Sequence, residues 1–314
     1  MSVWSRLWCS AAASGAQSQA TARCKLQGAA RRCSRAPHVP ARSVTTAGQG
    51  EAAGKNYVIT EKNGSIMTIG LNRPDVRNAV NRITALQLLE AFTTFERDKA
   101  LTAAVLYGTG GNFCAGYDLK ELPQAAASTK HDQDVTKDPG PMGPSRMQFS
   151  KPVIAAVSGY AVAGGLELAL LADLRVVEQS AIMGVFCRRF GVPLIDGGTV
   201  RLPKLIGLSR ALDLILTGRP ISAQEAYEFG LVNRVVPAGQ ALQSAVELAE
   251  QISAFPQHCM CADRASAYYG MFDASSFTEG MQAEFDNAKD VISKEAIPGA
   301  NKFILGTGRQ GKFS

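Results

Sequence analysis

Residues 151–173 read KPVIAAVSGYAVAGGLELALLAD, and this stretch decides the fold. It begins with an apolar run, Val153 to Val157, whose length and residue types are those of a buried strand. A break follows at residues 158–160, and then Gly164 and Gly165 open an apolar helix. Because strands and helices alternate on both sides of this stretch, we expect an α/β fold.

The expected helix carries one charged residue, Glu167. A lone carboxylate is costly to bury unless it has a partner or a chemical role. Gly164 and Gly165 leave backbone N–H groups unshielded at the helix start, where a ligand can approach them closely. This pattern predicts amide donors aimed at a developing oxyanion, with Glu167 as a proton-transfer group one turn away. A structural buried ion pair is the alternative interpretation of Glu167.

A second strand, glycine turn and helix precede this one in the sequence. The expected strand from Ala103 to Tyr107 ends in a glycine-rich turn, and residues 110–120 read GGNFCAGYDLK. We expect the two turns to lend one backbone N–H each to a single carbonyl oxygen. Such donors stabilise an enolate or a tetrahedral oxyanion, and each is worth about 3 kcal/mol.

The rest of the chain continues the alternation and then ends in helices alone. Residues 57–61 and 66–71 read as two strands of a hairpin. Residues 128–145 are polar and rich in Pro, Gly and Asp, and we interpret them as a loop that can gate a site. A further strand is expected at 174–177, and helices are expected at 82–96, 119–127, 165–172, 208–216, 223–229, 241–254 and 277–294.

Five short motifs follow one another along the chain: LNRP at 71–74 with Asn78 and Ala79, FCAGYDLK at 113–120, GYAVAGGLEL at 159–168, GGTVRLP at 197–203 and LTGRPISA at 216–223. In this order they resemble the crotonase superfamily, the enoyl-CoA hydratase/isomerase family. The resemblance implies a crotonase-type ββα spiral core over residues 55–240 and a C-terminal helical region over residues 241–314. It also implies assembly as a homotrimer or a homohexamer.

The same resemblance implies a site. Its oxyanion hole consists of the backbone N–H groups of Tyr117 and Gly164, which surround the thioester carbonyl of an acyl-CoA substrate. Glu167 matches one of the two catalytic glutamates of the hydratases. No cofactor is implied, because coenzyme A is part of the substrate. The substrate-binding positions that follow from the match are Arg77, Ala115, Gly116, Lys120, Gly165 and Cys187.

One departure from the family pattern concerns the second glutamate. An ungapped match places Cys187 at that position, and Asp196 is the nearest carboxylate that can replace it. Several relatives use an aspartate in this loop, usually one position earlier. An aspartate at position 196 is suited either to catalysis or to capping the N-terminus of the helix that follows, so the residue type alone does not separate the two roles. For Cys187 a pocket wall is favoured over a nucleophile, because no histidine lies nearby in the sequence.

These observations predict an enoyl-CoA hydratase-like lyase with Glu167 as acid/base and Asp196 as its partner. Because the second glutamate is replaced, three other activities of the superfamily remain as alternatives: enoyl-CoA isomerase, acyl-CoA decarboxylase and thioester hydrolase. A crotonase-fold protein that binds without catalysis is the remaining alternative. RNA-binding relatives would need a basic helix, and the helix from Arg82 to Lys99 balances three basic residues with three acidic ones.

The basic character of the chain is confined to its beginning. Residues 1–50 contain seven Arg and Lys residues and no Asp or Glu, so with a total of +6 the remainder carries 6 − 7 = −1. This composition predicts a mitochondrial transit peptide over residues 1–45 and a location in the mitochondrial matrix, with a disordered basic tail as the alternative. The balanced remainder gives no reason to expect a nucleic-acid partner.

Membrane and metal sites are not expected either. No apolar run reaches the roughly 18 residues that a membrane-spanning helix needs. The seven cysteines include no Cys-x-x-Cys pair, and the three histidines are scattered along the chain. We therefore expect reduced, mostly buried thiols and no metal centre.

Overall fold

The structure is a computed structural model that describes residues 56–123 and 133–308. The expected transit peptide (residues 1–45) lies outside this part of the chain. So does the second half of the helix expected at 119–127, as well as the start of the loop expected at 128–145.

The main sheet has six strands in the order β1-β2-β3-β4-β6-β9. β1 and β2 form the expected antiparallel hairpin, and the other neighbours in the sheet are parallel. The strands expected from the sequence are confirmed, whereas β9 had no prediction. The bounds are β1 (Val58–Asn63), β2 (Ile66–Leu71), β3 (Ala103–Gly108), β4 (Val153–Val157), β6 (Leu174–Glu178) and β9 (Arg234–Val236).

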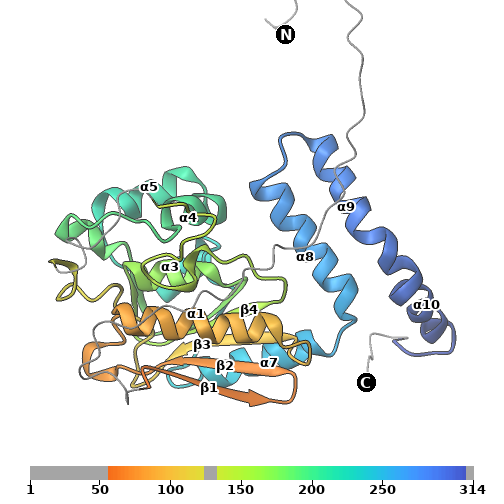
Figure 1. Cartoon of the computed structure of the whole chain (residues 1–314), viewed down its shortest axis with the longest axis horizontal. Helices are drawn as coiled ribbons and strands as arrows, with labels where there is room; N and C mark the ends of the chain where they lie inside the picture. The colour runs from red at the N-terminus through yellow and green to blue at the C-terminus, as the bar shows by residue number, and fades with distance from the viewer. Residues whose placement is uncertain (1–55, 124–132, 309–314) are drawn as a thin grey trace, which may run out of the picture. The chain divides into compact units, whose positions relative to one another are not determined.

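Both faces of the main sheet are covered, which explains the unbroken apolar run of β4. Leu106 and Ala155 face a core shared with α1 (Arg82–Arg97) and α3 (Gly164–Leu171). Val105 and Ile154 point to the opposite face, against α7 (Ala241–Ser253). Figure 1 shows α1 and α7 on either side of the strands. By packing, α7 is part of the core, although the expected boundary at residue 241 assigns it to the C-terminal helical region.

A second, three-stranded sheet has the order β5-β7-β8. Its strands are β5 (Tyr160–Val162), β7 (Ile182–Gly184) and β8 (Ile221–Ser222). Segments of two or three residues are too short to show a period of two, and for that reason the sequence did not predict them. The helices α4 (Gly198–Ile206), α5 (Leu208–Thr217) and α6 (Ala223–Glu228) complete the core.

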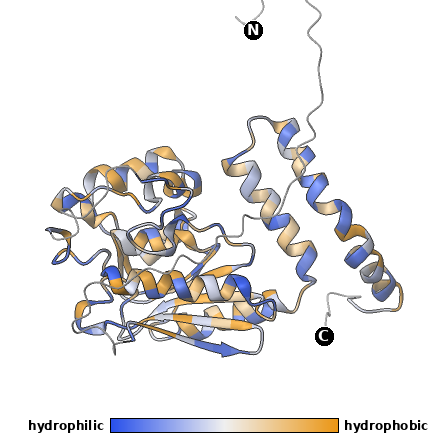
Figure 2. Ribbon diagram, viewed as in Figure 1, coloured by the Kyte–Doolittle hydropathy of each residue, from blue (hydrophilic) through white to orange (hydrophobic). Residues whose placement is uncertain are grey.

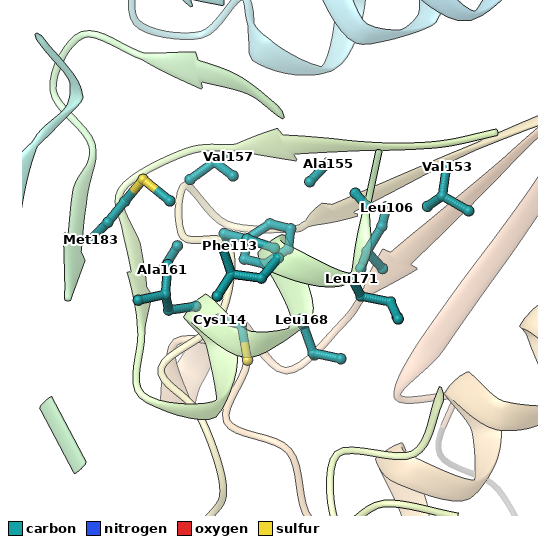
Figure 3. Close-up of a cluster of buried hydrophobic side chains, with 14 of the residues drawn as sticks. Leu106, Phe113, Cys114, Val153, Ala155, Val157, Ala161, Leu168, Leu171 and Met183 are labelled. Atoms are coloured by element: carbon teal, nitrogen blue, oxygen red, sulfur yellow. The ribbon is translucent and has the colours of Figure 1, made fainter. Parts of the chain in front are cut away.

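A cluster of buried apolar side chains packs α3 against the sheet (Figure 3). The Phe113 ring is fully buried and lies among side chains of β3, β4 and α3, including Leu106, Val157 and Leu168. Because Phe113 directly precedes the glycine turn at Cys114–Gly116, this packing fixes the position of that turn relative to α3.

The C-terminal region consists of helices, as expected from the sequence. α8 (Gln257–Phe272) is followed by α9 (Phe277–Val291), by a π-helical turn at Ile292–Ala296 and by α10 (Ile297–Ile304). Asp173 ties α8 to the core, because its Oδ1 accepts hydrogen bonds from Arg264 Nε at 2.9 Å and from the Tyr268 hydroxyl at 2.8 Å. The sequence did not predict α8, whose apolar and polar residues follow no clear stripe (Figure 2).

Two further features concern the described residues as a whole. No helix among them is long and apolar enough to cross a membrane. Within the same residues, no group of three or more His, Cys, Asp or Glu side chains is placed so that it could hold a metal ion.

Candidate active site

The first glycine turn directs one backbone amide away from its neighbours. Val80 donates its N–H to Gly116 O at 2.8 Å and accepts from Asp118 N at 2.9 Å. Val80 and Tyr117 thus form an isolated parallel β-bridge. In such a bridge both bonds go to the residues that flank Tyr117, so the N–H of Tyr117 itself points to the opposite side.

The second turn, which precedes α3 at Ala163, lies directly against the first turn at Cys114–Gly116. Val162 N donates to Cys114 O at 3.1 Å, and Cys114 N donates to Tyr160 O at 2.9 Å. A Cβ atom added to Gly116 would lie 3.0 Å from Gly164 N, and one added to Gly165 would overlap the Cys114 carbonyl oxygen. The glycines therefore permit a backbone approach that larger residues would prevent, and this approach brings the amides of the two turns side by side.

Gly164 N–H lies in the first turn of α3, where backbone amides lack intrahelical acceptors. Within residues 56–123 and 133–308, neither Tyr117 N–H nor Gly164 N–H donates to another protein group. Ala163, which precedes the helix, has φ 55° and ψ −127°, a conformation that is strained for a residue with a Cβ. The surrounding packing holds this strained turn, and with it the direction of the Gly164 amide.

Glu167 lies one turn further along α3 and is only 3% exposed. Its Oε1 accepts hydrogen bonds from Asp196 N at 3.0 Å and from Gly198 N at 2.8 Å. Every fully buried side-chain oxygen of the described residues has a partner, so Oε2, which has none among them, is open to the adjacent cavity. Burial raises the pKa of Glu167 to about 7, against the effect of the Gly198 amide and with a further contribution from Asp196.

Asp196 is the second buried carboxylate at this site, at 4% exposure. Its Oδ1 accepts a hydrogen bond from Met142 N at 3.0 Å and another from the Ser145 hydroxyl. Burial raises the pKa of Asp196, although these hydrogen bonds lower it. The N-cap of α4 is Gly197 and makes no side-chain capping bond. The N-capping alternative for Asp196 is therefore wrong, because its carboxylate binds the 142–145 segment instead.

A cavity of about 300 Å³ brings most of the expected site residues together. Its described lining includes Ala115, Tyr117, Gly164, Glu167, Cys187 and Asp196. The remaining wall is largely apolar and comes from Leu119, Leu122, Met142, Phe186, Phe190, Val192, Pro193 and Ile195 together with neighbouring residues. An apolar cavity with a few convergent polar groups is typical of a small-molecule site.

Four of the expected substrate-binding residues do not line this cavity in the described part of the chain. Gly116 and Gly165 are buried where the two turns meet, and their role is to allow that contact. Arg77 is exposed, and its guanidinium lies 5.3 Å from the centroid of the Tyr160 ring. Lys120 is exposed as well.

Cys187 lies in the 3-10 helix Phe186–Phe190 and forms part of the cavity wall. Burial raises the pKa of its thiol, and the nearby Glu167 raises it further. The thiol is therefore protonated at neutral pH, which suits a wall and does not suit a nucleophile. Arg188 and Arg189 turn away and donate to the backbone oxygens of Ile215 and Gly218 at the end of α5.

The 142–145 segment was not expected to hold a carboxylate. Ser145 is buried, its hydroxyl donates to Asp196, and its backbone oxygen accepts from Arg201 Nη2 at 2.8 Å. The alternation of Gly and Pro at residues 139–144 signals an unusual backbone. Nothing in the local sequence pairs Ser145 with a residue 51 positions away.

Comparisons with known proteins agree with this geometry. Residues 61–304 match the family model described as enoyl-CoA hydratase/isomerase. The chain is similar to the enoyl-CoA hydratase EchA19 of Mycobacterium tuberculosis, with 41% identity over 203 residues that cover 62% of this chain and 74% of the relative. It is also similar to the mevalonyl-coenzyme A hydratase sidH of Aspergillus fumigatus, with 34% identity over 244 residues that cover 76% and 88%.

A solved structure shares the architecture. The crystal structure of an enoyl-CoA hydratase from M. tuberculosis H37Rv superposes with a TM-score of 0.72 at 34% identity, covering 80% of this chain and 96% of that one. The chain therefore belongs to the enoyl-CoA hydratase/isomerase family and has its crotonase fold. Within this family it is an enoyl-CoA hydratase-like lyase.

Proposed function

We propose that the protein catalyses the reversible addition of water to the double bond of a 2-enoyl-CoA, with Glu167 and Asp196 as its two acid/base groups. One observation carries this proposal: Tyr117, Gly164 and Glu167 line the same cavity, and among the described residues neither the two amides nor Glu167 Oε2 has a partner. Hydration needs polarisation of the thioester and proton transfer at the neighbouring carbons, and these groups can supply both.

The substrate carbonyl oxygen binds between Tyr117 N–H and Gly164 N–H. Negative charge accumulates on this oxygen when a nucleophile adds to the β-carbon of the conjugated thioester. The two amides and the N-terminal end of α3 stabilise that charge without having to reorient, because the backbone already fixes them.

Glu167 acts as the base. Its Oε1 is held by two backbone amides, which leaves Oε2 to accept a proton from water while the water oxygen bonds to the β-carbon. The α-carbon then takes up a proton, so that one water molecule is added in total. Asp196 supplies this proton in place of the glutamate that Cys187 replaces. A further water then carries the proton from Glu167 to Asp196, which returns both carboxyl groups to their starting protonation states.

The test is a spectroscopic assay with purified protein that lacks the leader. Hydration removes the ultraviolet absorbance of the conjugated double bond, and product analysis by mass spectrometry shows the gain of one water. The proposal is supported if the wild-type protein removes this absorbance and the Glu167→Gln variant does not. Glu178→Gln is the matched control, because Glu178 is also buried but holds the Gly239 amide away from the cavity.

Two results would reject the hydration mechanism. A product of unchanged mass, a product that has lost carbon dioxide, or free coenzyme A would indicate isomerisation, decarboxylation or thioester hydrolysis. Full activity of Glu167→Gln would remove Glu167 from the mechanism. We also propose that no cofactor is needed beyond the coenzyme A of the substrate, and undiminished activity after dialysis against a chelator would support this.

We further propose assembly as a homotrimer or a homohexamer. Exposed apolar side chains on α9 and α10 support this, since surfaces of this kind mark association sites. Light scattering after size-exclusion chromatography measures the mass, and a monomer would refute the proposal. The side chains are Phe277, Met281, Phe285, Ile297, Phe303 and Ile304.

For residues 1–45 we propose import into the mitochondrial matrix. The support is compositional: seven basic residues and no acidic residue in the first 50 positions. A fusion of residues 1–55 to a fluorescent protein should reach the matrix and should be shortened by cleavage. Cytosolic fluorescence from an uncleaved fusion would contradict it.

A further inference from the structure

A second cavity, of about 550 Å³, borders the catalytic cavity. It lies between α1 and the 139–143 segment, and its apolar lining includes Ile83, Leu86, Leu89, Pro139 and Pro141. Among the described residues, only Tyr117 and Pro141 line both cavities. Because a proline ring has no rotamers to change, Tyr117 is the movable part of this shared wall.

The Tyr117 side chain has a favourable position to control passage between the cavities. It is half-buried, and its hydroxyl has no hydrogen-bond partner in the described part of the chain. Its backbone N–H belongs to the oxyanion hole. The ring that starts from the same residue therefore lies close to the place where the acyl group of a bound thioester begins.

The second cavity suits a hydrocarbon chain. Side chains of α1 and the two prolines form an apolar lining, with Arg82 and Glu121 as its charged members. The Glu121 carboxylate accepts a hydrogen bond from the backbone N–H of Arg82 at 3.0 Å. Its volume lies within the range of about 300–1,000 Å³ that is typical of ligand sites.

We propose that the Tyr117 ring sets the acyl-chain length by separating the catalytic cavity from an apolar chain-binding cavity beneath α1. This inference rests on the proposed function. The wild-type protein is thereby restricted to short acyl groups, and removal of the ring joins the two cavities into one site that takes a long straight chain. Tyr117 is thus a specificity-determining residue, apart from the role of its amide.

The experiment compares kcat/KM for crotonyl-CoA and for 2-hexadecenoyl-CoA in four proteins. Tyr117→Ala should raise the long-to-short ratio by about tenfold or more, the scale on which apolar pockets discriminate chain length. Tyr117→Phe should keep the wild-type ratio, because the ring remains. Tyr117→Ala combined with Leu86→Trp should cancel the gain, because the indole fills the second cavity.

A matched control and a binding measurement complete the design. Leu212→Trp places the same bulk on α5, outside both cavities, and should leave the activity and the ratio unchanged. If Tyr117→Ala does not fold, Tyr117→Leu serves instead. Calorimetric affinities for butyryl-CoA and palmitoyl-CoA, which need no turnover, should show the same gain for the long chain.

The outcomes separate this inference from the proposed function. If crotonyl-CoA is not hydrated but the variants change the relative affinity for palmitoyl-CoA, the hydratase mechanism fails and the chain-binding cavity stands. If crotonyl-CoA is hydrated and Tyr117→Ala leaves both ratios unchanged, the role of Tyr117 is refuted. An equal gain in the double variant would refute the second cavity as the chain site.

Discussion

The helices α3 and α9 differ most clearly in how deeply their residues are buried. All eight residues of α3 are buried, whereas none of the fifteen residues of α9 is. α3 has no side-chain cap and begins at a strained alanine, so contacts with the rest of the core hold it in place. α9 has local signals of its own: Ser276 accepts from Glu279 N, and the Glu279 carboxylate accepts from Ser275 N at 3.0 Å.

The difference shows where function can be placed. Tertiary packing around α3 can hold a carboxylate away from water and keep two amides without partners, which local signals alone cannot do. Several apolar residues of α9 are exposed, so this helix is suited to contacts outside the chain. Figure 2 shows the mixture of apolar and polar residues along α9. The following four experiments test this contrast, from the largest expected effect to the smallest.

Glu167→Gln should lower kcat by about 10²–10⁴-fold, because it removes the acid/base group and keeps its shape. The glutamine oxygen can still accept the amides of Asp196 and Gly198, so the fold should persist. Steady-state kinetics together with circular dichroism separate the two effects. A matching loss in Glu178→Gln would mean that buried carboxylates matter here for folding and not for chemistry.

The pH dependence of the free energy of unfolding should reveal that the Glu167 carboxyl group is buried. The pKa of Glu167 is about 7 in the folded protein and 4.5 in the reference state. Between these values the folded state keeps a proton that the unfolded chain has lost, so stability falls as pH rises through this window. Glu167→Gln should therefore gain up to roughly 3 kcal/mol over wild type between pH 4 and pH 8. Urea unfolding at several pH values measures this, and a constant difference would contradict the burial of Glu167.

A glycine-to-alanine substitution should lower the free energy of unfolding when made in α3 and raise it when made in α9. Gly165→Ala places a methyl group on the Cys114 carbonyl oxygen and should cost about 1–3 kcal/mol or more of unfolding free energy. Gly280→Ala in α9 meets only Ala274 Cβ, at 3.8 Å, and should add roughly 0.5–1 kcal/mol. Thermal or urea unfolding compares the variants, and stabilisation by Gly165→Ala would overturn the close contact of the two turns.

Phe285→Ser should show the smallest effect on the chain itself. Phe285 is 61% exposed on α9, so the free energy of unfolding of the isolated chain should change by less than about 0.5 kcal/mol. If the proposed assembly uses α9, the same variant should shift the mass measured by light scattering. A large loss of stability at concentrations where the protein is monomeric would show that α9 packs within its own chain.

The sequence predicted the fold where its signals are local. The run at residues 153–157 and the helical periods at 82–96 and 241–254 correspond to β4, α1 and α7 with small differences at the ends. The second sheet was not predicted because its strands contain two or three residues and gain their order from neighbours far along the chain. α8 was not predicted because its apolar residues form no stripe.

The site was predicted in part, for a related reason. Gly164 and Glu167 stand out because glycine pairs and lone acids are unusual within apolar segments. Tyr117 was predicted only through the resemblance to the crotonase superfamily. The partners of Asp196 could not be predicted, since Met142 and Ser145 meet it only through the tertiary fold. Arg77 and Lys120 remain predictions as substrate contacts, because the cavity lining that the structure describes does not include them.

The most direct test concerns the thioester carbonyl itself. Isotope-edited infrared difference spectroscopy can follow a carbon-13-labelled thioester carbonyl of crotonyl-CoA bound to Glu167→Gln, in which the substrate should stay intact. Hydrogen bonds from Tyr117 N–H and Gly164 N–H should move the carbonyl band to a lower frequency than in water. A bound substrate whose carbonyl band keeps its frequency in water would contradict the account.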